Sequence, residues 1–356
     1  MPSPEAIKAW RSLHPRFQTA RADDASRDLL PLLAANLERC GLRDPVTEQL
    51  TAVRERIASS NRILFDAGRR LLLALREAGI ETMLLKGGAL AEAFYRDPSL
   101  RSMGDLDVLV PTAQAQRALD VLRGAGWAPK TAITPGFIRA QHATDIVTGD
   151  GSVRCDLHWH VYWECCQPDA DEELWAASVS LDFAGVPTRM LGPADQLLHL
   201  CVHGSRRARR PTLRWIPDAF YVLRTGGIDW SRLLAQAERR RFVLRAGTML
   251  AYLRDAFTAP VPGQALARLE AMPVSRLERV EYHVGNRRQG LLGELPSYWC
   301  NYRRQRDGSR MFSPLGFPRY LQHTWKVASL GQVVHGALVR ARRRARMVIF
   351  GPSAPE

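Results

Sequence analysis

The stretches LLKGGAL, residues 84–90, and GDLDVLV, residues 104–110, decide how this chain folds. The first is an apolar run that ends in Lys86 and two glycines, and the second reads as a buried strand that carries Asp105 and Asp107. Residues two apart in a strand share a face, so these two carboxylates lie close together and repel unless a cation lies between them. A hard divalent ion such as Mg²⁺ resolves this conflict.

A third carboxylate follows in VRCDLHWHV, residues 153–161. Strand alternation places one set of polar side chains on a single face, namely Arg154, Asp156, His158 and His160. If this strand lies beside GDLDVLV, Asp156 joins the first two aspartates, and three carboxylates support two metal ions in phosphoryl transfer. The alternatives for the third position are Asp120, Asp145 and Asp150, but only Asp156 falls on the polar face of a clear strand.

The glycine pair supplies a possible phosphate site. Gly87 and Gly88 lie between an apolar run and a helical pattern, where glycine lets the backbone approach a phosphate and the helix start offers free N–H groups. Lys86 adds a positive charge beside this turn. The alternatives are a plain strand-to-helix turn and ordinary solvated charges at Lys86 and Arg101.

Composition favours a globular protein with an anionic ligand. The chain has 356 residues, of which 46% are hydrophobic and 24% charged, and its net charge is +14. Nearly all of the positive charge is arginine, which a GC-rich coding sequence can also produce, so the charge alone is weak evidence for nucleic-acid binding. No apolar run is long enough to span a bilayer, and no secretory signal is evident. The six cysteines lack C-x-x-C spacing, so we expect reduced thiols and a cytoplasmic location.

The hydrophobic pattern divides the chain into three regions. Residues 1–80 read as helices, with Gly79 as a stop, and residues 81–190 mix strands with helices. A turn at TGDGS, residues 148–152, predicts a hairpin. Residues 191–356 return to a helical pattern that is rich in arginine, and residues 329–350 predict a basic amphipathic helix.

These motifs resemble the DNA polymerase β-like nucleotidyltransferase superfamily, and within it the bacterial "uncharacterised nucleotidyltransferase" family. The resemblance lies in LKG-x-AL, in Arg101 before the D-x-D strand, in CDLHW, and in a helical region with His199, Trp215 and Asp218. It covers about residues 82–225. The gap from Gly88 to Asp105 is longer than the usual spacing, so we expect an extra turn there.

The resemblance implies an α/β (α+β) fold, with a small mixed sheet of the nucleotidyltransferase type between helical N- and C-terminal regions. It implies that Asp105, Asp107 and Asp156 bind two Mg²⁺ ions, that Gly87 and Gly88 hold the triphosphate, and that Lys86 and Arg101 assist them. The implied reaction moves a nucleoside monophosphate from ATP or another NTP to a hydroxyl or phosphate of an anionic small molecule, a peptide or protein, or an RNA end. Pyrophosphate leaves.

Other functions stay open at this stage. The main alternative is a non-catalytic module that binds nucleotide or RNA through its arginines, with binding that weakens steeply with salt. A second is a partner protein with a vestigial metal site. The pairs His158/His160 and His199/His203 invite a transition-metal interpretation, but no further ligand of that type is evident, so we expect structural histidines. Asp218 reads as a buried hydrogen-bonding residue, and the arginine runs at 206–210 and 340–346 read as solvated faces.

Overall fold

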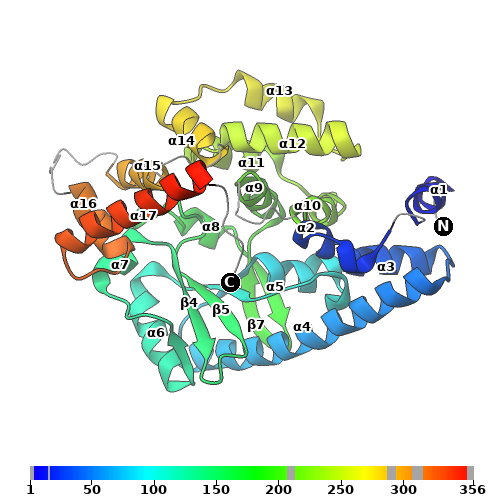
Figure 1. Ribbon diagram of the computed structural model, residues 1–356, viewed down its shortest axis with the longest axis horizontal. Coiled ribbons are helices and arrows are strands. Elements are labelled where there is room, and N and C mark those ends of the chain that lie inside the picture. Colours follow the sequence, from blue (N-terminus) through cyan, green and yellow to red (C-terminus); the bar gives the residue numbers. More distant parts are fainter. Residues whose placement is uncertain (1–3, 15–16, 207–212, 287–293, 307–315, 351–356) are drawn as a thin grey trace.

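The computed structural model describes residues 4–14, 17–206, 213–286, 294–306 and 316–350, and within the last range side chains only as far as residue 342. Four helices form the N-terminal region, and the longest of them runs under the whole sheet (Figure 1). It begins with a capping box. The carboxylate of Asp44 accepts a hydrogen bond from the backbone N–H of Thr47, and the Thr47 hydroxyl accepts one from the backbone N–H of Asp44. The four are α1 (Pro4–Leu13), α2 (Asp24–Arg27), α3 (Leu30–Arg39) and α4 (Pro45–Glu77).

A mixed sheet of seven strands occupies the middle of the chain. Its order is β3-β4-β5-β2-β1-β7-β6. The β5/β2 and β1/β7 pairs are parallel, and the other four pairs are antiparallel. The strands are β1 (Met83–Leu85), β2 (Leu106–Leu109), β3 (Trp127–Pro129), β4 (Ala143–Thr148), β5 (Arg154–His158), β6 (Val179–Phe183) and β7 (Val186–Met190).

Short helices connect these strands. After β1 the chain forms α5 (Lys86–Leu90), a π-helical turn (Ala91–Tyr95) and a 3-10 turn (Pro98–Leu100) before it reaches β2. These two turns fill the long gap between the glycines and the aspartates, so the expected extra turn is present. The remaining connections include a 3-10 turn (Thr112–Gln114), α6 (Ala115–Gly124), α7 (Pro135–Ala140) and α8 (Glu172–Ala176).

The two faces of the sheet differ in chemistry because side chains alternate along each strand. Leu106, Val108, Cys155 and Leu157 point to one face and pack in a core with α4 and α6. Met83, Leu85 and Leu109 point to the other face, in a core shared with the C-terminal helices. Asp107 lies between Leu106 and Val108 in β2, so its carboxylate faces the C-terminal helices and not α4.

The C-terminal region covers this second face with helices (Figure 1). The segment with Pro260 and Pro262 separates two of them, and the basic tail is helical, as the sequence predicts. The helices are α9 (Pro193–Gly204), α10 (Trp215–Leu223), α11 (Trp230–Arg239), α12 (Val243–Phe257), α13 (Gly263–Ala271), α14 (Arg276–Asn286), α15 (Leu295–Gln305), α16 (Gly316–Thr324) and α17 (Leu330–Phe350). In the part of the chain that the structure describes, no helix has both the length and the hydrophobicity needed to cross a bilayer.

The expected fold class is confirmed, and so are the strand–GG–helix unit and the β4/β5 hairpin. All six cysteines are free thiols. The sequence analysis missed the β6/β7 hairpin, which adds two strands beside β1. The three-region division at residues 80 and 190 stays a prediction. The helices α9–α12 share one hydrophobic core with the sheet.

Candidate active site

A row of charged residues crosses the sheet at one level. Asp107 of β2 lies directly opposite Asp156 of β5, and Asp156 lies opposite Asp145 of β4. Pro129 of β3 pairs with Ile146, so Lys130 leaves the sheet beside Asp145. At the other end Leu85 pairs with Asp107, and Lys86 follows it. The register therefore places three carboxylates side by side, with one lysine at each end of the row.

Lys86 and His158 bind the central carboxylate of this row. The Lys86 ammonium donates to Oδ1 of Asp107, and His158 Nε2 lies 2.9 Å from the same oxygen. Asp107 is 4% exposed. Burial works to raise the pKa of Asp107, but the Lys86 ammonium and the His158 ring outweigh it and hold this pKa well below its ordinary value. Asp107 is therefore a carboxylate in the folded protein, and no hydrogen bond from a described residue reaches its Oδ2.

Asp156 has the opposite electrostatic character. Burial, a hydrogen bond with Asp145 and the charge of Asp107 together raise the pKa of Asp156 to about 8. The same hydrogen bond lowers the pKa of Asp145. In the protein without metal, the proton of this pair therefore resides on Asp156. Its Oδ1 is buried and has no hydrogen-bond partner among the described residues.

Asp107, Asp156 and His158 are close enough to hold a metal ion together. One ligand atom from each lies within 4.8 Å of the others. The unpaired Oδ1 of Asp156 is an orphaned buried acceptor, and a cation would satisfy it. Two carboxylates give the hard oxygen ligands that Mg²⁺ prefers, so the residues present fit such an ion.

Asp105 lies outside this group of three. It precedes the first paired residue of β2 and forms an ion pair with Arg154, whose Nη2 is 3.3 Å from Oδ2 of Asp105. Burial and the nearby charge of Asp107 raise the pKa of Asp105. The structure thus brings together Asp107 and Asp156 from the predicted trio, and a metal-binding role of Asp105 stays a prediction.

The glycine turn is tightly packed against the residue that precedes the aspartate strand. A Cβ atom at Gly87 would lie 2.7 Å from Nη1 of Arg101 and 3.0 Å from the sulfur of Met103. Lys86 has φ of 42°, in the left-handed region that non-glycine residues rarely adopt. This backbone conformation turns the chain from β1 into α5 while the Lys86 side chain points to Asp107. Phosphate binding by Gly87 and Gly88 stays a prediction.

Arg101 is buried and tied to the helical layer. Its Nε and Nη2 donate to the two carboxylate oxygens of Asp218, at 2.8 and 2.9 Å. The hydroxyl of Tyr95 donates to Oδ1 of the same aspartate at 2.8 Å. The expectation that Asp218 is a buried hydrogen-bonding residue is confirmed. The Arg101 side chain therefore packs against the glycine turn at Gly87 while it binds Asp218. A contact between Arg101 and a nucleotide stays a prediction.

His160 and His199 are both buried. His160 Nδ1 lies 2.8 Å from Asp171, and burial keeps the pKa of His199 well below its ordinary value. Both observations agree with the expected hydrogen-bonded or buried roles. The arginine run at 206–210 lies outside the described residues apart from Arg206, which donates to Glu164.

Sequence reasoning missed two features of this site. His158 was expected to be a sheet histidine, and it also binds the central aspartate; its position two residues after Asp156 in the same strand was the available signal. Asp145 was only an alternative to Asp156, whereas the hairpin register places the two side by side. A fixed register could have revealed this pair, but the sequence alone does not fix it.

Known proteins similar to this chain include one sequence family and two solved structures. The model of a family described as "Uncharacterised nucleotidyltransferase" matches residues 25–258. No curated protein matches the chain. The solution structure of the antibiotic-resistance factor ANT(2'')-Ia is similar at 13% identity, covers 55% of this chain and 92% of its own, and has a TM-score of 0.36. An antigenic nucleotidyltransferase-like protein from Paracoccidioides brasiliensis is similar at 14% identity, covers 61% of this chain and 94% of its own, and has a TM-score of 0.38.

The family match includes every residue of the row from Lys86 to Asp156, and also Arg101 with its partner Asp218. It spans well over half of the 356 residues. The chain therefore belongs to the uncharacterised nucleotidyltransferase family and is an enzyme of the nucleotidyl-transfer class.

Proposed function

We propose that this enzyme transfers a nucleoside monophosphate from an NTP, in the presence of Mg²⁺, to a hydroxyl or phosphate of an acceptor, with release of pyrophosphate. The observation that carries the proposal is the register of β2 and β5, which sets the carboxyls of Asp107 and Asp156 side by side on the face away from α4. One oxygen of Asp156 is buried there without a partner.

Asp107 and Asp156 would hold the metal, with Asp105 as a further ligand at the open end of the strand. Bound Mg²⁺ supplies neutralisation of charge on the phosphate oxygens. Lys86 brings a second positive charge to the same place and can turn from Asp107 toward a triphosphate, since its side chain is long and flexible. Gly87 and Gly88 would present backbone N–H groups to that triphosphate. Arg101 acts on this turn from its buried bond to Asp218.

An acceptor would reach the row of charged residues at Asp156. It lines a cavity beside β4, whereas Asp107 is buried between Lys86 and His158. An acceptor hydroxyl in that cavity would lie next to the Asp156 carboxylate, which can accept its proton when the new bond to phosphorus forms. Phosphoryl transfer needs little covalent help, so positioning and charge are what the chain must supply.

The test is label transfer from NTPs that carry ³²P at the α-phosphate. Purified protein with Mg²⁺ and a cell extract should move the label from one of ATP, GTP, CTP or UTP to an acceptor. Asp107→Asn and Asp156→Asn should reduce this transfer at least a hundredfold, because each removes a metal-binding charge from a preorganised site. Asp120→Asn is the matched control, since Asp120 is exposed on α6 and pairs only with neighbours on its own helix.

Ligand stabilisation gives a second readout that needs no acceptor. ATP should raise the Tm of the wild type only with Mg²⁺, and Asp107→Asn should abolish the shift. Full transfer activity in the Asp107→Asn/Asp156→Asn double variant would refute the site. Transfer of label from the γ-phosphate alone would indicate a kinase. Binding that ignores Mg²⁺ and falls steeply with salt would indicate the non-catalytic module instead.

A further inference from the structure

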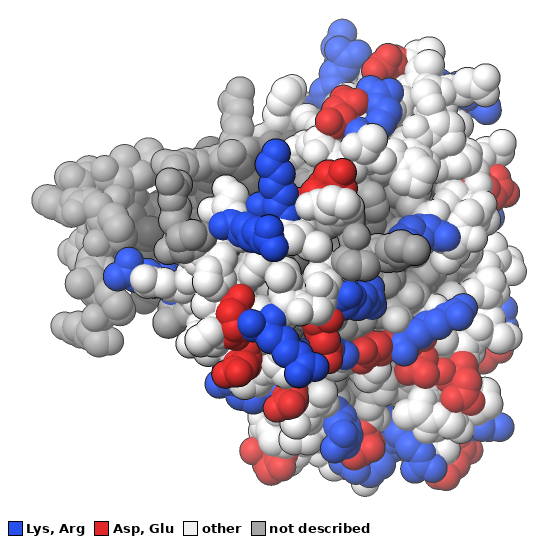
Figure 2. Space-filling view, turned by 90° about the vertical axis from the view of Figure 1, so that its right-hand side faces the viewer, with Lys and Arg blue, Asp and Glu red and all other residues white. Residues whose placement is uncertain are grey.

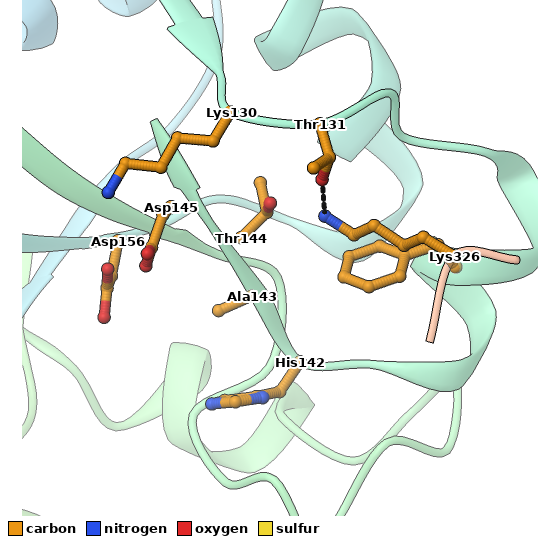
Figure 3. A pocket seen from close by; sticks show the side chains of 9 residues that line it. Lys130, Thr131, His142, Ala143, Thr144, Asp145, Asp156 and Lys326 are labelled. Atoms are coloured by element: carbon orange, nitrogen blue, oxygen red, sulfur yellow. Dashed lines mark hydrogen bonds between the residues drawn. The ribbon is translucent and has the colours of Figure 1, made fainter. Parts of the chain in front are cut away.

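A cavity of about 270 Å³ adjoins the charged row on the β4 side (Figure 3). Asp145 and Asp156 form one end of it, so the cavity opens directly onto the proposed site of transfer. The rest of its wall comes from the segment after β3, from α7, and from the segment that joins α16 to α17. The lining residues are Lys130, Thr131, Phe137, His142, Ala143, Thr144, Asp145, Asp156 and Lys326.

The cavity is electrostatically polarised. Figure 3 shows the Lys130 side chain extending toward the two aspartates at one end, and Lys326 pointing to Thr131 at the other. The Lys326 ammonium donates to the Thr131 hydroxyl at 2.5 Å and lies 4.1 Å from the centroid of the Phe137 ring. It has no carboxylate partner among the described residues. One end of the cavity therefore offers an ammonium and a hydroxyl, and the other offers two carboxyl groups with the Lys130 ammonium beside them.

Lys326 is held in this place at a conformational cost. Its φ is 55°, in the left-handed region, at the position after α16 where glycine or asparagine is usual. A side chain in this region is strained, because its Cβ atom crowds the backbone. Lysine is also scarce in this chain, since the 50 basic residues include only Lys8, Lys86, Lys130 and Lys326. Two of these four line the cavity.

Close packing between α7 and α16 brings Lys326 to the sheet. A Cβ atom at Gly136 would lie 2.2 Å from the His323 ring, so α16 can approach α7 this closely only because residue 136 is glycine. His323 lies three residues before Lys326, which therefore reaches the cavity from a part of the chain far from β4 and β5. Lys326 also lies outside the range 25–258 that matches the family.

We propose that this cavity binds the acceptor, and that the acceptor group is a hydroxyl within a few bonds of a phosphate or carboxylate. The anion lies at Lys326 and Thr131, and the hydroxyl faces Asp156. The volume of about 270 Å³ falls just below the usual range for ligand pockets, about 300–1,000 Å³, so the cavity takes a small molecule or a single group at the end of a longer chain. This inference rests on the proposed function, because only that reaction requires a nucleophile at Asp156.

The test is calorimetric titration of the full-length protein with sn-glycerol 3-phosphate and, for the carboxylate case, with 3-hydroxybutyrate. At least one should bind saturably, and glycerol should bind at least tenfold more weakly than its phosphate. Lys326→Gln should weaken binding about tenfold, the value of one charge-assisted hydrogen bond. Lys8→Gln is the matched control, since Lys8 is an exposed lysine on α1, far along the chain from the cavity. Thr131→Val serves as a second variant that leaves the charge unchanged.

These titrations contain neither nucleotide nor metal, so they remain readable if the proposed transfer reaction fails. Equal affinity in wild type, Lys326→Gln and Thr131→Val would overturn the assignment, as would the absence of saturable binding for both probes. The nucleotide site is tested separately by the Asp107→Asn variant. Offering the acceptor group free and then at the end of a peptide distinguishes a small-molecule acceptor from a larger one.

Discussion

In the charged row at the centre of the sheet, neighbouring residues determine one another's protonation. Asp107 stays ionised in a buried place because Lys86 and His158 both bind its Oδ1. Asp156, its neighbour on β5, holds a proton up to about pH 8 because burial disfavours its charged form, and the hydrogen bond with Asp145 and the charge of Asp107 add to this effect. Two carboxylates in register therefore differ in protonation, and the difference comes from their partners and not from their own chemistry.

The raised pKa of Asp156 predicts a pH-dependent cost in the metal-free protein. The unfolded chain releases this proton near the ordinary value of 3.8, whereas the folded chain keeps it to about 8. The stability that Asp156 contributes is thus fully present below pH 4 and is lost as pH rises to 8. The loss is on the order of 2–4 kcal/mol, after discounting for partial exposure and for the lowered pKa of Asp145.

The measurement is urea unfolding in EDTA from pH 5 to 9. Asp156→Asn cannot ionise and its amide can still donate to Asp145, so its stability relative to wild type should rise across this range. Asp120→Asn should follow the wild type. A constant difference between Asp156→Asn and wild type at all pH values would contradict the raised pKa.

At this scale the sequence predicts part of the site. Alternation is a strict geometric rule, so it assigns Asp156 to the polar face of its strand. The register that sets Asp156 opposite Asp107 comes from the structure. Asp105 falls outside the group because pairing of β2 begins only at Leu106. The bonds of Lys86 to Asp107 and of Arg101 to Asp218 depend on side-chain packing between segments far apart in the chain, and no local pattern encodes this.

Among the secondary-structure elements, α4 determines where the sheet lies. Its period of three and four apolar residues makes the helix predictable, and its buried face covers β2 and the β6/β7 hairpin. That hairpin was missed because it is short and mostly exposed on one strand. Its strongest signal is the AG turn at residues 184–185, where both residues have positive φ.

Close contact between α4 and the sheet predicts the effect of a small substitution. A Cβ atom at Gly68 would lie 2.4 Å from Cδ1 of Leu106 and 3.0 Å from Cε1 of Phe183, both buried. Gly68→Ala should therefore destabilise the fold by about 1–3 kcal/mol through overpacking, despite the better helix propensity of alanine. Denaturant unfolding measures this change.

Gly124→Ala is the matched control for that substitution. Gly124 ends α6, and a Cβ atom there would meet nothing within 4 Å. This variant should be neutral or slightly stabilised. Leu106→Val should partly restore the stability of Gly68→Ala by removing the atom that clashes. Equal stability of the two glycine variants would show that α4 can shift freely on the sheet.

Across the whole molecule, one buried ion pair ties the sheet layer to the helical layer. Arg101 precedes β2, and Asp218 lies on α10, a helix of the C-terminal region. Arg101→Ala should cost about 3–5 kcal/mol, because it leaves a buried carboxylate without its cation. Arg123→Ala removes an exposed pair and should cost less than about 1 kcal/mol.

A double-mutant cycle tests this interpretation. Arg101→Met with Asp218→Leu should cost clearly less than the sum of the single changes, because no charge is left unpaired. Additive losses would mean that the two residues stabilise the protein separately. Chemical denaturation with two probes, tryptophan fluorescence and circular dichroism, would also show whether the two layers unfold together.

Positive and negative side chains are mixed on one face of the molecule. Figure 2 shows a face on which Lys and Arg side chains are interspersed with Asp and Glu, and on which no continuous basic stripe is visible. In the N-terminal region, Arg54 likewise pairs with Glu38 at 2.8 Å and with Asp97 at 3.1 Å. On this face, therefore, acidic neighbours compensate much of the arginine content.

The lysine that turns the chain out of β1 has a practical consequence for handling this enzyme. In many small metalloproteins the ion is the only counter-charge for its ligands, and a chelator unfolds them. Here the side chain of residue 86 already neutralises the buried carboxylate of Asp107 before any ion arrives. Removal of divalent ions with a chelator should consequently abolish the activity while the protein stays folded. Adding the ions back should restore the activity without a refolding step.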